Sequence, residues 1–277
     1  MKPPLSPTSD FVFKKIFGNN KTVLEDFLKA VLDLPPEEYK DLTVVDSSLD
    51  QEFIQDKRGI LDIKINTASG KVIDVEVQVK PQSFIWKRML FYTSKMVVEQ
   101  LQTGHNYERI NRVISILVAD FVMVEGIDAC HNRFRLYDRN TGVCYPESVE
   151  INVLELPKLR ESDDTPLYNW MRFFRAKTEE DLMSVSRTNP AIKEACDMVI
   201  YLSGDERERA IAEAIEKSRR DHEAYLSDAR YEGLQEGLEK GKLEVARNLL
   251  REKVSFDTIS KTTGLSLEEV KRLAAEP

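Results

Sequence analysis

The chain has 277 residues, of which 42% are hydrophobic and 32% are charged, a composition typical of a soluble protein with a substantial core. It contains no run of 18 apolar residues, so no membrane span is expected. The net charge of −8 argues against a nucleic-acid coat or an architectural DNA-binding protein, although it leaves room for a local basic face.

Cysteine and histidine are too scattered to indicate a metal centre of their own. Cys130, Cys144 and Cys196 follow no metal-ligand spacing and are expected to be free thiols in a reducing cytoplasm. The three histidines are equally dispersed, which disfavours a zinc site. The N-terminal sequence MKPPLSPTSD lacks the apolar stretch of a secretory signal, so a cytoplasmic protein is expected.

The first predicted element is an amphipathic helix over residues 10–32. The segment Gly18-Asn19-Asn20 is expected to break it in two, and Pro35-Pro36 follows its end. Ser9 or Asp10 is suited to cap its start, and Asp10 could instead be a metal ligand. A strand is predicted within residues 42–55.

Residues 60–80, ILDIKINTASGKVIDVEVQVK, predict a β-hairpin, and this is the most informative feature of the chain. Its second strand alternates strictly, with Asp74, Glu76, Gln78 and Lys80 on one face and valines on the other. A solvated outer face would produce the same alternation. The function of this polar face therefore depends on what lies opposite it.

The turn of the hairpin sets its register. A three-residue loop, Ala68-Ser69-Gly70, with a left-handed glycine, is a common connection and pairs Thr67 with Lys71. Asp62 then lies opposite Glu76, with Cβ atoms roughly 5 Å apart. A two-residue loop would put Asp62 on the apolar face, which disfavours that register.

Two opposed carboxylates repel each other unless a cation lies between them. Carboxylate oxygens are ligands that Mg²⁺ prefers, so Asp62 and Glu76 are suited to hold one. Lys64 is expected on the same face, opposite Asp74. Glu25 on the first helix and Glu52 on the preceding strand are further candidate acids.

The residues after the hairpin predict a helix, a buried strand and two further strands. Residues 84–104 have helical apolar spacing, with Arg88, Tyr92 and Lys95 on one side. Residues 112–124 form a near-continuous apolar run typical of a buried strand. Residues 133–156 predict two strands, the second with Val149, Ile151 and Val153 facing inward.

The last third of the chain is predicted to be helical, with Trp170, Phe173 and Phe174 as packing anchors. In the charged helix over 205–250, glycines 233, 237 and 241 recur every four residues. Each costs roughly 1 kcal/mol relative to alanine, so they indicate either close approach of a second helix, as in a homodimer, or a poorly stable linker. The two short helices of the tail fit either an assembly element or a DNA-reading unit.

The order helix, strand, hairpin, helix, buried strand resembles the core of the PD-(D/E)xK nuclease superfamily. More narrowly, the chain resembles the bacterial recombination-promoting nuclease and transposase family. The resemblance rests on DFVFKKIFG at 10–18, the hairpin, KRMLFYTSKM at 87–96, LELPKL at 154–159 and TGLSLEEV near the end. These segments span nearly the whole chain, and the resemblance rests on their occurring together in this order rather than on any one of them.

The resemblance implies a role for each hairpin residue. Asp62 and Glu76 would hold Mg²⁺, or Mn²⁺ in its place, together with the carbonyl of Val77. Gln78 stands where the superfamily usually has lysine and would orient a water, and Lys64 or Lys80 would supply the missing charge. Arg88, Tyr92 and Lys95 would contact DNA, although Arg88 and Tyr92 are equally suited to packing.

These observations predict an α/β protein with a restriction-endonuclease-like αβββαβ core, a mixed central sheet flanked by helices, and an α-helical C-terminal extension. Expected divisions are a nuclease-like domain at 1–160, a helical extension at 161–224 and a glycine-repeat helix with a bihelical tail at 225–277. The expected function is magnesium-dependent DNA cleavage linked to recombination or transposition, without a small-molecule cofactor. The alternative is a catalytically weak assembly protein that binds DNA or protein.

Overall fold

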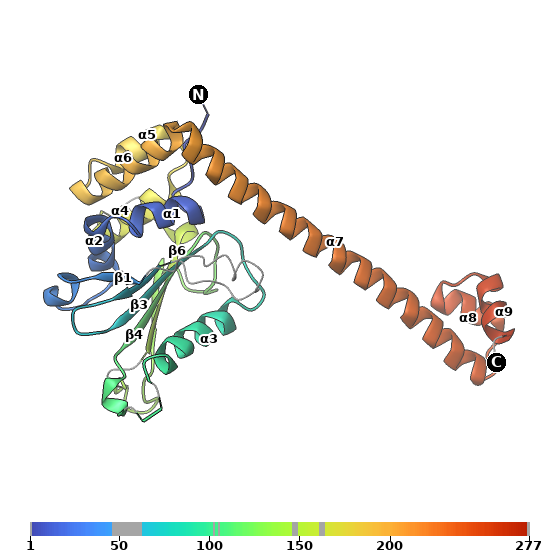
Figure 1. The fold of residues 1–277 in the computed structure, drawn as a ribbon. Coiled ribbons are helices and arrows are strands. Elements are labelled where there is room, and N and C mark those ends of the chain that lie inside the picture. The colour runs from blue at the N-terminus through green and yellow to red at the C-terminus, as the bar shows by residue number, and fades with distance from the viewer. Residues whose placement is uncertain are drawn as a thin grey trace. The chain divides into compact units, whose positions relative to one another are not determined.

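The computed structural model describes residues 2–45, 63–101, 103–104, 106–145, 149–160 and 164–275. The chain forms two compact units, Met1–Ala212 and Glu213–Pro277 (Figure 1). Helix α7 (Glu206–Arg251) begins in the first unit and continues into the second. Within the described ranges, every helix is too short or too polar to cross a membrane.

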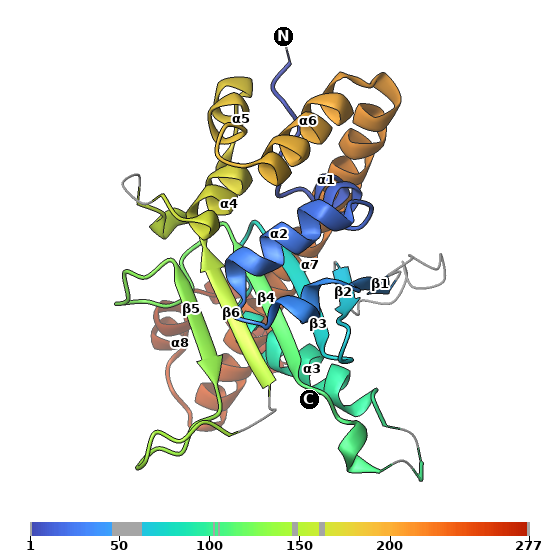
Figure 2. The same cartoon turned by 90° about the vertical axis from the view of Figure 1, so that its left-hand side faces the viewer.

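The first unit is built on a mixed sheet, which the described residues form with six strands in the order β1-β2-β3-β4-β6-β5 (Figure 2). The strands are β1 (Thr43–Val45), β2 (Ile63–Asn66), β3 (Val72–Gln78), β4 (Val113–Ala119), β5 (His131–Arg135) and β6 (Val149–Glu155). Neighbours β3, β4 and β6 are parallel, and the outer strands pair antiparallel. The predicted mixed sheet is therefore confirmed.

The hairpin of β2 and β3 has the predicted register. Lys64 pairs with Asp74, and the Thr67 N–H donates to the Lys71 carbonyl at 3.0 Å across the end of the loop. Gly70 has φ = 86°, the left-handed conformation that the three-residue loop requires of it. Asp62, one residue before β2, lies outside the described residues.

One face of the sheet is covered by α1 (Asp10–Phe17), α2 (Lys21–Val31) and the later helices α4 (Pro166–Arg175), α5 (Glu179–Val185) and α6 (Pro190–Gly204). The predicted break in the first helix is confirmed, because Gly18 ends α1 and Asn20 caps α2. Trp170, Phe173 and Phe174 are all at most 2% exposed, and their rings contact Phe17, which Phe174 stacks against. Trp170 and Phe174 also meet Phe27 edge to face. These aromatic rings join the N-terminal and C-terminal helices of the unit.

The other face of the sheet is covered by α3 (Ile85–Val98), which ends six residues before the predicted Gly104. Ile85 and Met89 pack on Leu117 and Val153, and Met96 packs on Val72 and Val113. Since β3 presents Asp74 and Glu76 to this side, α3 lies over the polar face of the hairpin.

Strand β6 departs from its predicted pattern. Its polar residues Glu150 and Asn152 are 2% and 0% exposed, whereas Val149 and Ile151 are only partly buried. The sheet is covered on both faces, so both sets of side chains on β6 are enclosed. Short 3₁₀ helices complete the unit at Pro36–Tyr39 (η1), Tyr107–Arg109 (η3) and Leu156–Lys158 (η4).

The second unit contains the C-terminal part of α7 with α8 (Phe256–Thr263) and α9 (Leu267–Ala275). Ala246 of α7 packs with Ile259 of α8 and with Val270 and Leu273 of α9. Gly264 has φ = 73° and ends α8 in the left-handed conformation, as a helix-turn-helix connection requires. The three glycines of α7 are exposed, and a methyl group added at any of them would contact no described residue beyond the neighbouring backbone of α7 itself.

Candidate active site

The candidate site is centred on Glu76, near the carboxyl end of β3. Glu76 is only 5% exposed, because α3 covers it, yet it accepts no hydrogen bond from any described residue. Its nearest ionic partner is Arg88 on the first turn of α3, whose Nη2 lies 3.7 Å from Glu76 Oε2. This separation is long for a charge-assisted hydrogen bond.

The electrostatic environment leaves the Glu76 carboxylate poorly compensated. Burial raises the pKa of Glu76, the charge of Arg88 lowers it, Asp10 raises it again and Lys14 lowers it, with a net rise above the ordinary value. Asp10 and Lys14 both lie on α1, four residues apart, so they share one helix face. The start of α1 therefore contributes one acid and one cation to the surroundings of Glu76.

Another buried glutamate, Glu150 on β6, has its negative charge balanced by cations and hydrogen-bond donors. It pairs with Arg112 and Arg135 and accepts a hydrogen bond from Asn152 Nδ2 at 2.9 Å. Burial would raise the pKa of Glu150, but the hydrogen bonds from Asn152 and Arg135 and the charge of Arg112 hold it below the ordinary value.

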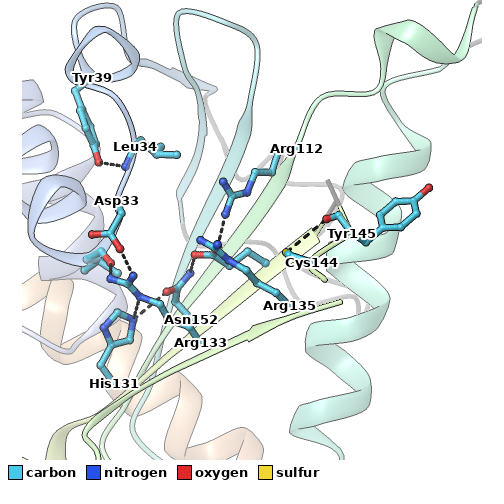
Figure 3. Close-up of polar contacts among 12 residues, drawn as sticks. Asp33, Leu34, Tyr39, Arg112, His131, Arg133, Arg135, Cys144, Tyr145 and Asn152 are labelled. Atoms are coloured by element: carbon cyan, nitrogen blue, oxygen red, sulfur yellow. Dashed lines mark hydrogen bonds and ion pairs between the residues drawn. The ribbon is translucent and has the colours of Figure 1, made fainter. Parts of the chain in front are cut away.

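The network around Glu150 continues towards α2 (Figure 3). Asn152 Oδ1 lies 2.9 Å from His131 Nε2, and Arg133 pairs with Asp33 and donates to the Val31 carbonyl at the end of α2. Its buried acid and amide are thus paired within the protein, which identifies this network as a structural link between α2 and the sheet. Glu76 has no comparable set of partners.

Gln78, at the end of β3, is connected to Arg88 through one intervening amide. Gln82 Nε2 donates to Gln78 Oε1 at 3.2 Å, and Arg88 Nη1 donates to Gln82 Oε1 at 3.2 Å. The Arg88 guanidinium also lies 5.6 Å from the ring centroid of Tyr92. Gln78, Gln82, Arg88 and Tyr92 therefore form one polar edge beside Glu76.

The polar face of the hairpin is enclosed on the Asp74 side. A cavity of about 10 Å³ lies between β3, β4 and α3, lined by Asp74, Glu76, Tyr92 and Ser115 among others. This volume is about that of a single water. Since Asp74 is 3% exposed and Glu76 5%, the interpretation of these two residues as a solvated outer face is wrong.

The other predicted site residues are distributed along the hairpin and α3. Val77 is buried beside Glu76, and Lys80 is exposed beyond the end of β3. Lys64 Nζ lies 3.0 Å from Glu99, eleven residues and about 16 Å along the helix from Arg88. Lys95 pairs with the same Glu99 at 3.6 Å.

The alternative acids are placed as follows. Glu25 pairs with Lys29 at 2.6 Å on α2, and Glu52 lies outside the described residues, as Asp62 does. Ser9 caps α1 by accepting from the Val12 N–H, and Asp10 is the first helical residue, so Asp10 is not the cap.

Two residues of the site were not assigned a role from sequence. Lys14 belongs to the DFVFKKIFG segment, and its spacing of four from Asp10 was the available signal. Gln82 lies in the connection from β3 to α3 and carried no periodic signal.

Comparison with protein families fits this geometry. The model of the family described as PD-(D/E)XK nuclease family transposase matches residues 7–229. The chain belongs to this family. The predicted resemblance and the fold class of a PD-(D/E)XK nuclease are therefore confirmed. No match was found among curated proteins or among solved structures.

A second family model matches the tail of this nuclease family member. It describes the C-terminal HTH domain of the Rpn/YhgA-like nuclease family and covers residues 239–275, the part that contains α8 and α9. Of the two interpretations of the tail, this match favours the helix-turn-helix. Among the described residues, no three His, Cys, Asp or Glu side chains gather closely enough to hold a metal ion.

Proposed function

We propose that the protein is a divalent-metal-dependent DNA endonuclease that hydrolyses phosphodiester bonds during recombination or transposition. Asp62 and Glu76 hold the metal, with the carbonyl of Val77 as a further ligand, and Mg²⁺ or Mn²⁺ is the ion. The observation that carries the proposal is the buried, poorly compensated carboxylate of Glu76. Its raised pKa contrasts with the lowered pKa of Glu150 in the same sheet.

Of the two proposed carboxylate ligands of a hard divalent cation, Glu76 lies among the described residues and Asp62 lies outside them. Glu76 offers carboxylate oxygens as ligands. Burial and the negative charge of Asp10 on α1 both disfavour the charged form of Glu76. A positive ion bound there would stabilise that charged form. Arg88 Nη2 approaches Glu76 only to 3.7 Å, and Lys14 acts on it from α1. When bound, such an ion polarises the scissile phosphate and makes its water more acidic.

The protein groups around the metal position the reactants. Gln78 orients the attacking water through its amide, and Gln82 fixes that amide by a 3.2 Å hydrogen bond. Arg88 holds Glu76 and Gln82 together and faces the DNA strand with Tyr92.

Lys14 is the cation that replaces the missing superfamily lysine and stabilises the charge that develops on the phosphate. Its positive charge acts on Glu76. Lys64 is less suited to this role than Lys14, because its partner Glu99 lies eleven residues along the chain from Arg88, at the far end of α3.

A nicking assay on supercoiled DNA with Mg²⁺ tests the proposal. Asp62→Ala and Glu76→Ala are expected to lose at least about a hundredfold in rate. Glu99→Ala is the matched control, because it removes one acid at the far end of α3. Equal nicking by the wild type, Glu76→Ala and Glu99→Ala would remove the proposal.

A second candidate function is a catalytically weak protein that binds DNA or another protein and assembles through its C-terminal helices. The neutral Gln78 and the matched helix-turn-helix domain favour it. Calorimetry separates the two. Heat of DNA binding that does not depend on Mg²⁺, together with no heat from Mg²⁺ alone, would favour the assembly protein.

A further inference from the structure

A large cavity lies at the carboxyl end of β4 and β6, in the first unit of the chain. Its volume is about 770 Å³, within the range of about 300–1,000 Å³ that is typical of ligand pockets. Its walls come from the N-terminal segment, from Asp120 after β4, from Pro157 after β6, and from α4 and α5. In open α/β sheets, ligands bind outside the carboxyl ends of the strands, which is where this cavity is.

Two connections join this cavity to the candidate active site. The Asp120 N–H donates to the carbonyl of Gln78 at 2.9 Å, so the cavity wall and the site share the end of one strand pair. Along the N-terminal segment, Thr8 lines the cavity, whereas Asp10 and Lys14 act electrostatically on Glu76. The cavity and Glu76 therefore both lie at the carboxyl ends of the parallel strands of the sheet.

The walls of the cavity are rich in cations. Arg172, Arg175 and Lys177 line it, against two acids, Asp120 and Asp181. The Asp181 carboxylate already accepts the backbone N–H groups of Lys177 and Thr178, both at 2.9 Å. The charge of Lys177 also acts on Asp181, and the lining keeps one cation more than it has acids.

Arg175 and Lys177 are the cations available to a ligand. Arg172 Nη1 donates a hydrogen bond to Asn169 Oδ1 at 3.0 Å and lies 3.8 Å from Asp164 Oδ1. Arg175 and Lys177 are exposed, and neither forms an ion pair with a residue in the described part of the chain. Two such cations at the mouth of one cavity are suited to an anion such as a phosphate group.

The remaining walls are suited to the rest of a nucleotide. Phe174, Ala176 and Val185 are buried and give the cavity an apolar floor. Ser6, Thr8, Ser184 and Thr188 add hydroxyl groups that can donate to or accept from a sugar or base. An anion site, an apolar floor and hydroxyl groups together match one nucleotide unit.

We propose that this cavity binds one nucleotide of the DNA strand next to the scissile phosphate, with its phosphate held by Arg175 and Lys177. The identification of the strand as DNA rests on the proposed nuclease function. The cavity adds a binding subsite that the metal ligands do not supply, and it fixes which part of the strand reaches Glu76.

Anisotropy of a labelled single-stranded oligonucleotide of about 12 nucleotides tests this subsite in the full-length chain. Single-stranded DNA is the probe because a helix-turn-helix reads the major groove of a duplex. All variants carry Glu76→Gln so that binding is measured without cleavage. The test variant is Arg175→Gln with Lys177→Gln.

The matched control is Arg187→Gln with Lys193→Gln, which removes the same charge from exposed positions that do not line the cavity. The cavity variant is expected to bind several-fold more weakly. The slope of log Kd against the logarithm of the salt concentration is expected to be smaller by about 0.7 in the cavity variant, which corresponds to one lost phosphate contact. The control is expected to keep the parent slope, and circular dichroism verifies that all variants fold.

Equal slopes and affinities for the cavity variant and the control would overturn the subsite. Displacement of the oligonucleotide by a 5′-mononucleotide at the same concentration would also overturn it, because the ligand would then be a free nucleotide. The nicking assay reports separately on the nuclease. Nicking by Glu76→Ala at the wild-type rate, with binding still dependent on Arg175 and Lys177, would remove Glu76 from the nuclease site and keep the subsite.

Discussion

Replacement of Glu38 by glutamine is expected to weaken the hairpin that carries Glu76. Glu38, on η1, is 8% exposed and holds the hairpin loop from outside the hairpin. It accepts hydrogen bonds from Thr67 Oγ1, from Ser69 Oγ at 2.9 Å and from Lys71 Nζ at 2.6 Å. These are three of the five residues that form and close the loop.

The pKa of Glu38 gives the magnitude. Burial would raise this pKa, but the hydrogen bonds from Lys71, Thr67 and Ser69 lower it from 4.5 to about 2. Each pKa unit is worth about 1.4 kcal/mol, so the charged form contributes up to about 3 kcal/mol at pH 7. A lowered carboxyl pKa stabilises the protein above pH 4.5, and the contribution is lost as the pH falls towards 2.

Urea unfolding at pH 7 and at pH 3 measures this contribution. Glu38→Gln is expected to cost up to about 3 kcal/mol at pH 7 and about half as much at pH 3. Glu37→Gln on the same turn is the control and is expected to stay within about 0.5 kcal/mol, because Glu37 is exposed. The role of Glu38 would be refuted if Glu38→Gln lowered the free energy of unfolding at pH 7 no more than Glu37→Gln does. A loss of the same size at pH 7 and pH 3 would also refute it.

Three further predictions concern the site and the second unit. Without metal at pH 7, Glu76→Gln is expected to melt at a higher temperature than the wild type, because burial raises the pKa of Glu76, and the gap is expected to close as the pH falls through this raised pKa towards 4.5; a lower melting temperature would contradict this. In the nicking assay, Lys14→Gln is expected to lose about tenfold or more while Lys64→Gln loses less, because the charge of Lys14 acts on Glu76 whereas Lys64 lies beside Glu99 at the far end of α3; the reverse order would return the cationic role to Lys64. Light scattering is expected to show a homodimer formed through α7, weakened by Gly237→Leu, and a monomer at high protein concentration would contradict it.

The hairpin could be predicted from sequence because its determinants are local. The alternation of β3, the left-handed Gly70 and the pairing of Thr67 with Lys71 lie within a few residues of one another. Trp170 and Phe173 were predictable as anchors for a different reason, since they and Phe174 are large aromatic side chains clustered within one short helical segment, where they can bury together.

The surroundings of the hairpin could not be predicted, because they come from distant parts of the chain. Whether Glu76 faces solvent depends on α3, and the partner of Lys64 is Glu99, 35 residues away. The burial of Glu150 on β6 depends on Arg112, 38 residues earlier. Periodicity alone assigned Val149, Ile151 and Val153 of β6 to the interior. The ion pairs of Glu150 with Arg112 and Arg135 allow the opposite, polar face of β6 to be buried as well.

The most direct test is a crystal of the full-length protein soaked in Mn²⁺, with the anomalous signal used to locate the ion. One peak is expected between the carboxylates of Asp62 and Glu76, and no such peak is expected in Glu76→Ala crystals. Crystals that take up manganese at other positions while Glu76 stays without a peak would contradict this expectation.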